Sequence, residues 1–239
     1  IKFLGVLILK LSLKSNKIVF FQNPDDKELF LTHRIVTNDQ ARLVNGSGIN
    51  LEKFKTSPLP PDPVFLCMAR LIKSKGLMEY ARAAKLAKQK NPKARFLLYG
   101  YPDYHKDSID ESEIKDNWFY QYGIEYFGYA NDPIGAIQKS NVFVLLSYKE
   151  GTPRVVLEAM ALGRPIISTI TPGCKETVIE GVNGFLVPKY DFKLAAKAMI
   201  DLMNKDLRLS MGAESRAYCE EKFDVKNVNN NMLREMQII

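Results

Sequence analysis

Cysteine is scarce in this sequence: its 239 residues include three, at positions 67, 174 and 219. No two of them form a CxxC pair, and an odd number would leave one thiol outside any disulfide framework. We therefore expect a protein of a reducing, cytosolic compartment, in which each cysteine is a small buried hydrophobic residue.

Motifs that mark several common enzyme classes are also missing. The sequence contains neither HExxH, GxxxxGK nor a DxD metal motif. Gly46 and Gly48 begin a GxGxxG pattern, but Leu51 stands where the third glycine belongs. These absences weigh against a zinc hydrolase, a P-loop NTPase and a standard dinucleotide-binding protein.

The longest apolar stretch, "IKFLGVLILKLSLK" at the start, is too short to span a membrane, and Lys2 and Lys10 interrupt it. It has no starting Met and no small-residue cleavage site, which disfavours a secretory signal. Two interpretations stay open. One is an interfacial helix whose lysines reach the membrane surface. The other, which we favour, is a core helix of a domain whose beginning is missing.

Positive charge exceeds negative charge, with a formal net charge of +7. Residues 1–60 hold nine Lys and Arg against five Asp and Glu, so +4 of that excess lies in the first quarter. Such an excess favours anionic partners, namely phosphates, nucleic acid or an acidic membrane face. Solubility alone is the other explanation.

From residue 64 onward, short apolar runs alternate with helical patterns. The runs occupy residues 64–69, 95–100, 124–129, 141–147, 164–169 and 184–187. Long helical patterns occupy residues 76–90 and 191–205. Strands that are apolar on both faces predict a parallel sheet covered on both sides. We predict an α/β fold with a doubly wound parallel sheet, whose ligands lie at the carboxyl ends of the strands.

Domain boundaries follow from composition. The Pro-rich segment "KTSPLPPDP" at 55–63 is typical of a semi-rigid linker. Upstream, residues 17–23 are predicted as another buried strand. We therefore predict the remnant of another α/β domain and a connector at 1–55, the main domain at 56–222, and a C-terminal helix at 223–239.

Two cations follow the first strand of the main domain. Arg70 and Lys75 lie five residues apart in its loop, where they can converge on one polyanion. A guanidinium offers a bidentate fork and an ammonium a point charge, a combination that suits a diphosphate. A solvated basic loop is the alternative interpretation.

A second candidate group lies in "EGTPRVVLEAMALG", at residues 150–163. Thr152 is predicted to cap a helix, with Pro153 in its first turn and Gly163 after its end. Glu150 then precedes the helix and Glu158 lies inside it. The free N–H groups and dipole of the helix start favour an anion there.

Glu158 needs a partner because its neighbours are apolar. An unpartnered carboxylate in such a helix would cost roughly several kcal/mol. A salt bridge to Arg154, Arg164 or Lys175 is one solution. A ligand's vicinal diol is another, because one carboxylate accepts from two adjacent hydroxyls. A diphosphate, a diol and further hydroxyls together describe a nucleotide sugar.

These motifs together resemble the C-terminal, donor-binding domain of a retaining glycosyltransferase of family 4, with the GT-B fold, over about residues 17–225. The E-x7-E signature stands at Glu150 and Glu158, and the basic loop at Arg70, Lys75 and Gly76. Residues 45–54 resemble the segment by which the chain enters the family's C-terminal domain. Residues 172–187 resemble the stretch that follows its signature helix. The resemblance is strongest to enzymes that build bacterial capsule, O-antigen and lipid-linked oligosaccharides.

The resemblance implies a role for each matching residue. Arg70 and Lys75 bind the donor diphosphate, Glu158 holds the ribose hydroxyls, and Glu150 contacts the transferred sugar. The phosphate and sugar pocket is lined by the backbone of Gly151, Thr152 and Pro153. Nucleobase contacts are expected from the loops after 95–100 and around 128–133. The resemblance further implies that no metal and no other cofactor is required.

The implied reaction moves a sugar from a nucleotide sugar, expected to be UDP-linked, to a saccharide or undecaprenyl-diphosphate-linked acceptor with retention of configuration. The implied setting is surface polysaccharide synthesis in the cytoplasm, peripheral at the inner face of the cell membrane, without nucleic acid. Because little of the family's acceptor-binding domain is present, we expect an incomplete fragment that binds donor without turnover.

Three alternatives remain beside this hypothesis. A nucleotide-sugar epimerase and a phosphorylase share the GT-B fold. A non-catalytic basic module for membrane surfaces or nucleic acid would explain the charge, but it leaves Glu158 without an explanation.

Overall fold

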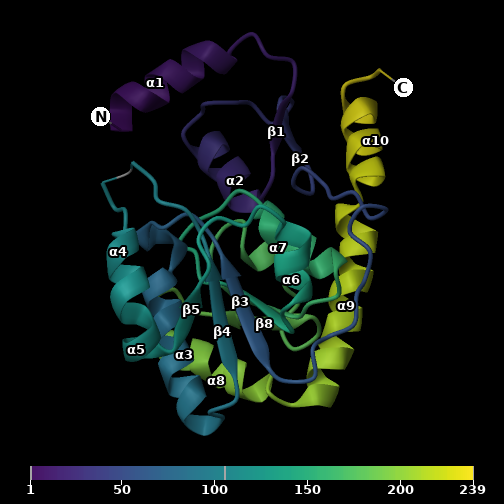
Figure 1. Cartoon of the computed structure of the whole chain (residues 1–239). Coiled ribbons are helices and arrows are strands. Elements are labelled where there is room, and N and C mark those ends of the chain that lie inside the picture. The colour runs from purple at the N-terminus through teal and green to yellow at the C-terminus, as the bar shows by residue number, and fades with distance from the viewer. Residues whose placement is uncertain (1, 105, 239) are drawn as a thin grey trace.

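Six parallel strands form the main sheet of the computed structural model, which describes residues 2–104 and 106–238 (Figure 1). Their order across the described sheet is β5-β4-β3-β6-β7-β8. The strands are β3 (Val64–Met68), β4 (Arg95–Tyr99), β5 (Ile124–Tyr126), β6 (Val142–Leu145), β7 (Ile166–Thr169) and β8 (Gly184–Val187). Every neighbouring pair is parallel, so the predicted doubly wound α/β fold is confirmed.

Helices cover both faces of this sheet because its strands are apolar on both faces. Phe65 and Cys67 point into a core shared with α3 (Leu77–Lys90) and α8 (Phe192–Asp201). Val64 and Leu66 point into the opposite core, shared with α6 (Pro133–Gln138), α7 (Arg154–Ala161) and α9 (Lys205–Phe223). The period-2 alternation of side chains along β3 thus builds two hydrophobic cores, one on each face.

Short helical segments connect the outer strands and loops. They are η1 (Lys73–Lys75), α4 (Glu111–Glu113), the π-helical η2 (Ile114–Trp118), α5 (Phe119–Tyr122) and η3 (Lys175–Thr177). Trp118 is fully buried against the core on the α3 side, which fixes the α4–α5 segment on the sheet edge beside β4 and β5.

The strand order places a crevice at one defined position. From β3 the chain winds outward to β4 and β5, whereas from β6 it winds in the other direction to β7 and β8. The loops that follow β3 and β6 therefore leave the same edge of the sheet in opposite directions. At such a switch point α/β proteins bind their ligands. Both predicted groups of site residues lie on these two loops, except Glu158, which lies in the helix that follows the loop after β6.

A small N-terminal unit precedes the main domain. It consists of α1 (Lys2–Leu13), β1 (Val19–Phe21), α2 (Pro24–Thr32) and β2 (Ala41–Leu43). Strands β1 and β2 pair in parallel around a core of Phe21, Ile35, Val36 and Ala41. The strand predicted at 17–23 is present as β1.

Helix α1 is largely exposed in this unit, and both interpretations of it stay predictions. Leu4, Ile8 and Leu11 are 60%, 57% and 66% exposed, because the two short strands of this unit offer too little sheet to cover them. Within the described part of the chain, no helix combines the length and the apolarity needed to cross a bilayer.

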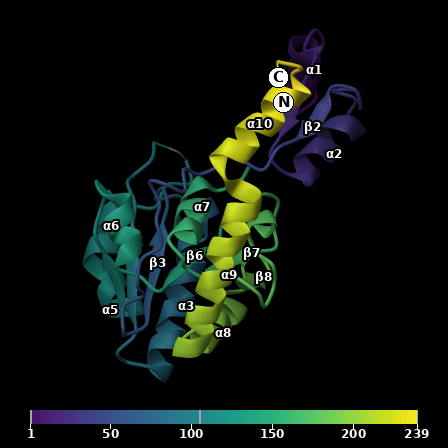
Figure 2. The same cartoon turned by 90° about the vertical axis from the view of Figure 1, so that its right-hand side faces the viewer.

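The end of the chain returns to the N-terminal unit. Helix α10 (Val225–Glu235), predicted at 223–239, continues from α9 and lies beside β2 (Figure 2). Arg42 on β2 forms an ion pair of 2.6 Å with Glu235. Ile49 bridges the two parts, because its N–H donates to Phe223 and its carbonyl accepts from Val225.

The proline-rich connector is fastened to the main domain. Asn141 donates to the carbonyl of Pro60 at 2.6 Å, and Arg164 donates to the carbonyl of Ser57 at 2.7 Å. The segment therefore follows the surface of the domain as a fixed strap, in contrast to the semi-rigid spacer predicted from its prolines.

Candidate functional site

A cavity of about 330 Å³ opens at the switch point, at the carboxyl edge of the sheet. Loops after β3, β4, β5 and β6 all contribute to its lining. Five of the seven predicted site residues line it, namely Arg70, Lys75, Glu150, Pro153 and Glu158. The cavity therefore brings together predicted site residues that lie far apart in the chain, from Arg70 to Glu158.

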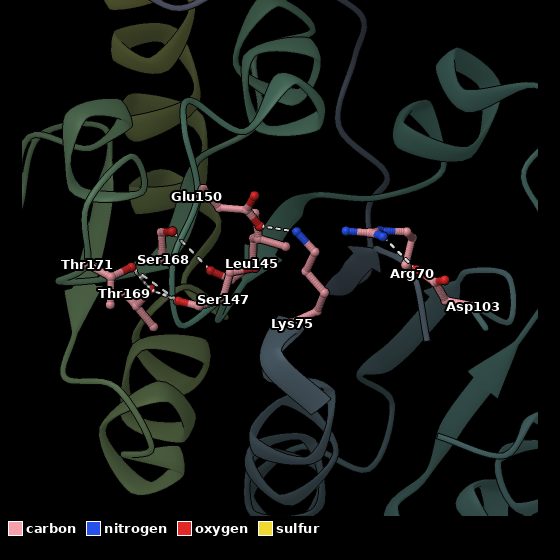
Figure 3. A network of polar contacts seen from close by, with 9 residues as sticks. All are labelled: Arg70, Lys75, Asp103, Leu145, Ser147, Glu150, Ser168, Thr169 and Thr171. Carbon is pink, nitrogen blue, oxygen red and sulfur yellow. Dashed lines mark hydrogen bonds and ion pairs between the residues drawn. The ribbon is translucent and has the colours of Figure 1, made fainter. Parts of the chain in front are cut away.

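Lys75 and Glu150 form an ion pair inside this cavity. Lys75 Nζ lies 2.5 Å from Glu150 Oε1, and the side chains are 17% and 15% exposed (Figure 3). Lys75 is the last residue of η1, and Gly76 follows with φ of 67°. A Cβ at Gly76 would lie 2.1 Å from the carbonyl oxygen of Leu146. Glycine is thus required for η1 to approach β6 closely enough for the pair to form.

Arg70 has a carboxylate partner that the sequence did not predict. Its Nη1 lies 2.5 Å from Asp103 Oδ2, in the loop after β4 (Figure 3). The Arg70 side chain is 46% exposed. Both predicted cations are therefore present at the cavity, and each is neutralised by an acid. An incoming polyanion has two cations to bind once it replaces these carboxylates.

Helix α7 begins one residue later than a Thr152 cap would place it. Pro153 is the N-cap residue, and no side chain caps the helix. Thr152 points instead toward the N-terminal unit, where its Oγ1 donates to the carbonyl of Gln22 at 3.2 Å. The predicted cap is wrong because this tertiary hydrogen bond occupies the hydroxyl. The predicted end is confirmed, since Gly163 follows the helix with φ of 78°.

Glu158 lies on α7 with its side chain 15% exposed at the cavity. Among the three predicted salt-bridge partners, Arg154 is the one in contact, with Nε 3.3 Å from Glu158 Oε1. The Arg154 side chain is 63% exposed, so the pair is weakly held. Burial raises the pKa of Glu158 above its usual value, against the opposing effect of Arg154 and Lys53.

The other two predicted partners of Glu158 are engaged elsewhere. Lys175 pairs with Asp25 at 2.8 Å. Arg164 is fully buried and donates to carbonyl groups, including that of Leu162 at 2.6 Å. The Glu158 carboxylate therefore faces the cavity with one ion-pair partner, the exposed Arg154.

Gly151 and Thr152 lie outside the cavity lining. The carbonyl of Gly151 accepts from Asn23 Nδ2 at 3.2 Å, and the Thr152 N–H donates to Gln22 Oε1 at 3.1 Å. In this structure both residues connect the site loop to the N-terminal unit. Asn23 and Gln22 carried no motif that would have identified them from the sequence.

The segment after β7 holds the loop from the other side. The N–H of Glu150 donates to the carbonyl of Pro172 at 3.1 Å. Gly173, with φ of 80°, lies so close that a Cβ there would be 2.0 Å from the Gly151 oxygen. The stretch at 172–187, which the resemblance placed after the signature helix, thus packs directly against the signature itself.

Hydroxyl groups support the end of β6 below the loop. Thr169 Oγ1 and Thr171 Oγ1 both donate to the carbonyl of Ser147, and Ser168 Oγ donates to that of Leu145 (Figure 3). Because these groups are buried, the hydrogen bonds fix the direction in which residues 148–153 leave the sheet.

Aromatic rings line the wall opposite Glu150. Tyr99, Tyr101 and Tyr129 belong to the cavity lining, together with Gly100 and Ala130. The rings of Tyr101 and Tyr129 meet edge to face with centroids 5.7 Å apart. Tyr101 lies on the first of the two loops predicted to contact a nucleobase, and Tyr129 and Ala130 lie on the second. The sequence did not single them out.

The three cysteines are buried, free thiols, as expected. Burial raises the pKa of Cys67 and of Cys219 to about 12 in each case. Neither thiol is therefore activated as a nucleophile at neutral pH.

The model of one protein family, described as glycosyl transferases group 1, matches residues 49–222. Staphylococcus aureus CapM, a capsular polysaccharide biosynthesis glycosyltransferase, is 29% identical over 87% of this chain and 61% of its own length. A Campylobacter jejuni N-acetylgalactosaminyltransferase that acts on N,N'-diacetylbacillosaminyl-diphospho-undecaprenol is 27% identical over 88% and 58%. The chain thus spans about six tenths of the length of these curated relatives.

Solved structures share the fold at lower identity. Anabaena HepE, solved with UDP and glucose, superimposes with a TM-score of 0.82 at 19% identity, over 98% of this chain and 68% of HepE. Sucrose-phosphate synthase from Thermosynechococcus elongatus gives a TM-score of 0.81 at 24% identity, over 97% and 60%. The likeness confirms the predicted GT-B fold.

Proposed function

Since the chain belongs to the glycosyl transferases group 1 family, we propose that it binds the nucleotide-sugar donor of a retaining, family 4 glycosyltransferase. One observation carries the proposal: Arg70, Lys75, Glu150 and Glu158 converge on a single cavity at the switch point of the sheet. Two cations for a diphosphate and two acids for hydroxyl groups are the complement of a nucleotide sugar.

We assign each part of the donor to residues of this site. Lys75 and Arg70 bind the diphosphate, Glu158 accepts from the ribose hydroxyls, and Glu150 accepts from hydroxyls of the sugar. The backbone of Gly151, Thr152 and Pro153 shapes the loop between the two acids. The rings of Tyr101 and Tyr129 form the wall on which the nucleobase stacks.

Charge development on the leaving group is the chemical problem of glycosyl transfer. Negative charge grows on the nucleoside diphosphate as the bond to the anomeric carbon breaks. The Lys75 ammonium and the Arg70 guanidinium stabilise this charge once the diphosphate has replaced Glu150 and Asp103 as their partners. In the proposed mechanism these two side chains supply the stabilisation that a metal ion supplies in other enzymes. The acceptor attacks on the face from which the diphosphate leaves, so configuration is retained.

The donor and acceptor classes are drawn from the similar proteins. UDP and glucose are bound in the HepE structure, and a diphospho-undecaprenol-linked sugar is the acceptor in the name of the Campylobacter enzyme. We propose a UDP-linked donor and a saccharide or lipid-linked saccharide acceptor, in surface polysaccharide synthesis at the cytoplasmic face of the membrane.

A thermal-shift panel of UDP-, GDP- and ADP-sugars tests donor binding. A donor at about a hundredfold excess over its dissociation constant stabilises the folded state by about 2.7 kcal/mol, so we expect one nucleotide series to raise Tm clearly. No shift with any nucleotide would refute the donor site. Release of UDP and free sugar without acceptor would indicate an epimerase instead.

Replacing Glu158 with glutamine is expected to weaken donor binding and to stabilise the folded protein. The folded state raises the pKa of this carboxyl, so ionising it costs stability as pH rises from the unfolded value through the folded one. At pH 7, Glu158→Gln removes that cost and should raise Tm. The same change removes an acceptor for the ribose and should reduce the donor-induced shift.

Glu214→Gln is the matched control, because Glu214 is an exposed acid on α9, away from the cavity. Its Tm and its donor-induced shift should equal those of the wild type. A full donor-induced shift in Glu158→Gln would contradict the ribose role. A Tm of Glu158→Gln equal to that of wild type at pH 7, or a Tm difference that does not shrink at pH 4, would contradict the burial argument.

A further inference from the structure

Four side chains of residues 22–26 reach from the N-terminal unit to the site loop at 149–152 or its neighbour at 175. Two of them, Gln22 and Asn23, make hydrogen bonds to the loop backbone. The other two, Asp25 and Asp26, pair with Lys175 at 2.8 Å and Lys149 at 3.0 Å. The family match begins only at residue 49, so these contacts come from outside it.

Asn23 is the buried member of this group. It is 1% exposed, and all three of its side-chain hydrogen bonds lie within the protein. Oδ1 accepts from the Asp26 N–H at 2.8 Å and so caps α2. Nδ2 donates to Asp26 Oδ2 at 3.0 Å and to the Gly151 carbonyl at 3.2 Å. One amide thus joins the start of α2 to the residue next to Glu150.

Gln22 holds the next residue of the loop. Its Oε1 accepts from the Thr152 N–H at 3.1 Å, and its own carbonyl accepts from Thr152 Oγ1 at 3.2 Å. A Cβ at Gly151 would lie 2.9 Å from Gln22 Oε1, so the loop and the Gln22 side chain are in close contact. Glycine at this position lets the Gln22 side chain approach the loop backbone.

The two ion pairs matter less than the amide contacts. Lys149 and Asp26 are 61% and 27% exposed, and Lys175 and Asp25 are both 39% exposed. Water screens pairs of this exposure, and such pairs contribute little. The Asn23 amide is 1% exposed, so its N–H groups depend on acceptors within the protein, of which the Gly151 carbonyl is one.

We propose that Asn23 is a positioning residue for the donor site, acting on Glu150 through the Gly151 carbonyl. The peptide of residues 150–151 is held at its two ends by different elements: Pro172 accepts from the Glu150 N–H, and Asn23 donates to the Gly151 oxygen. Loss of the Asn23 contact leaves the Glu150 carboxylate free to turn away from Lys75 and from the sugar. The inference rests on the donor site proposed above.

Asn23→Ser tests this contact with little disturbance to α2. Serine caps a helix about as well as asparagine, so α2 keeps its N-cap while the donor to Gly151 is lost. Asn204→Ser is the matched control, because Asn204 caps α9 by accepting from the Leu207 N–H at 3.0 Å, away from the cavity. Because each variant replaces one asparagine N-cap with serine, the two should have nearly the same Tm as each other.

Two measurements on the full chain decide the matter. The first is amide hydrogen exchange of the peptide that covers residues 148–153, without ligand. The second is calorimetric binding of UDP and of UDP-glucose. In Asn23→Ser we expect faster exchange of this peptide and roughly three- to tenfold weaker UDP-glucose binding, the size of one buried hydrogen bond. UDP lacks the sugar that Glu150 contacts in the proposed site, so UDP binding should change less than twofold. Asn204→Ser should match wild type in both measurements.

The outcomes separate this inference from the proposed function. Unchanged exchange in Asn23→Ser overturns the contact's role, whatever the nucleotides do. Faster exchange with an unchanged ratio of UDP-glucose to UDP affinity shows a merely structural contact and also overturns the inference. If wild type binds neither nucleotide, the proposed function fails, and the exchange result still decides whether Asn23 holds the loop.

Discussion

Replacing Lys75 with methionine is expected to weaken UDP binding about ten- to a hundredfold, the size of one lost charge-assisted hydrogen bond to a diphosphate. Methionine keeps the unbranched stem of lysine and removes the charge. Lys75 is 17% exposed and pairs with Glu150 at 2.5 Å, so its ammonium is already placed and partly desolvated before a donor arrives. Arg70, which is 46% exposed, is not placed to compensate for it.

Lys75→Met should also change how Glu150 affects donor binding. Without Lys75, the 15% exposed Glu150 carboxylate loses its counter-ion and faces an incoming diphosphate as a like charge. Glu150→Gln should therefore restore part of the UDP affinity of Lys75→Met in the double variant. In the wild-type background, Glu150→Gln frees Lys75, so UDP should bind at least as tightly, while the advantage of UDP-glucose over UDP should shrink.

Calorimetry with UDP and UDP-glucose measures all four proteins of this cycle. Lys73→Met is the control, because Lys73 is an exposed lysine on the same short helix η1 and does not line the cavity. It should bind UDP within about twofold of wild type. Equal loss in Lys73→Met and Lys75→Met would show that net charge, and not a placed ammonium, accounts for the affinity.

The fold could be predicted because its signals are local. The central strands are runs such as "VFLCM" that are apolar on both faces. The end of α7 is marked by Gly163, whose left-handed backbone suits glycine. The order of the strands has no local signal, because β3 and β6 are neighbours through pairing across more than seventy residues. The edge of the sheet that carries the site could still be predicted, because the loops after parallel strands gather at one edge.

Partners of site residues were harder to predict than the residues themselves. Arg70, Lys75, Glu150 and Glu158 were chosen by residue type and loop position, and all four line the cavity. Asp103, which holds Arg70, belongs to a loop whose direction no short-range pattern determines. Pairings of this kind depend on side-chain directions and on elements that meet only after folding.

Thr152 shows how a sound local rule is overridden. Threonine before a proline at a helix start is a good N-cap candidate, and the sequence predicted one. In the structure the hydroxyl lies against Gln22, which is 130 residues away in the chain. The N-terminal unit thus competes with α7 for the same hydroxyl, and this tertiary contact prevails. The same unit supplies Asn23, so the site extends beyond the domain that carries its motifs.

Arg164, one of the partners considered for Glu158, has a structural position, and replacing it with methionine is expected to cost about 3–5 kcal/mol of unfolding free energy. The side chain is fully buried and donates to six oxygen atoms. These atoms belong to the end of α6, the end of α7 and the connector at Ser57 and Pro58. Burial lowers the pKa of Arg164 to about 10, so it remains charged at neutral pH.

The size of this effect comes from the acceptors that methionine would abandon. A single buried carbonyl left without a donor costs about 1–3 kcal/mol, and Arg164 satisfies five carbonyls and the Ser57 hydroxyl. Part of this cost is offset, because the methionine variant no longer has to bury a charged guanidinium. Arg164→Lys should recover less than half of the loss, since one ammonium cannot reach acceptors on three segments.

Urea unfolding measures the change, with Arg95→Met as the matched control. Arg95 is 50% exposed and pairs with Glu125 at 2.5 Å, so its loss should cost about 1 kcal/mol or less. If the unfolding free energy of Arg164→Met lies within about 1 kcal/mol of that of wild type, water replaces the guanidinium among these carbonyls. The fastening of the connector to the end of the signature helix would then not contribute to holding the domain together.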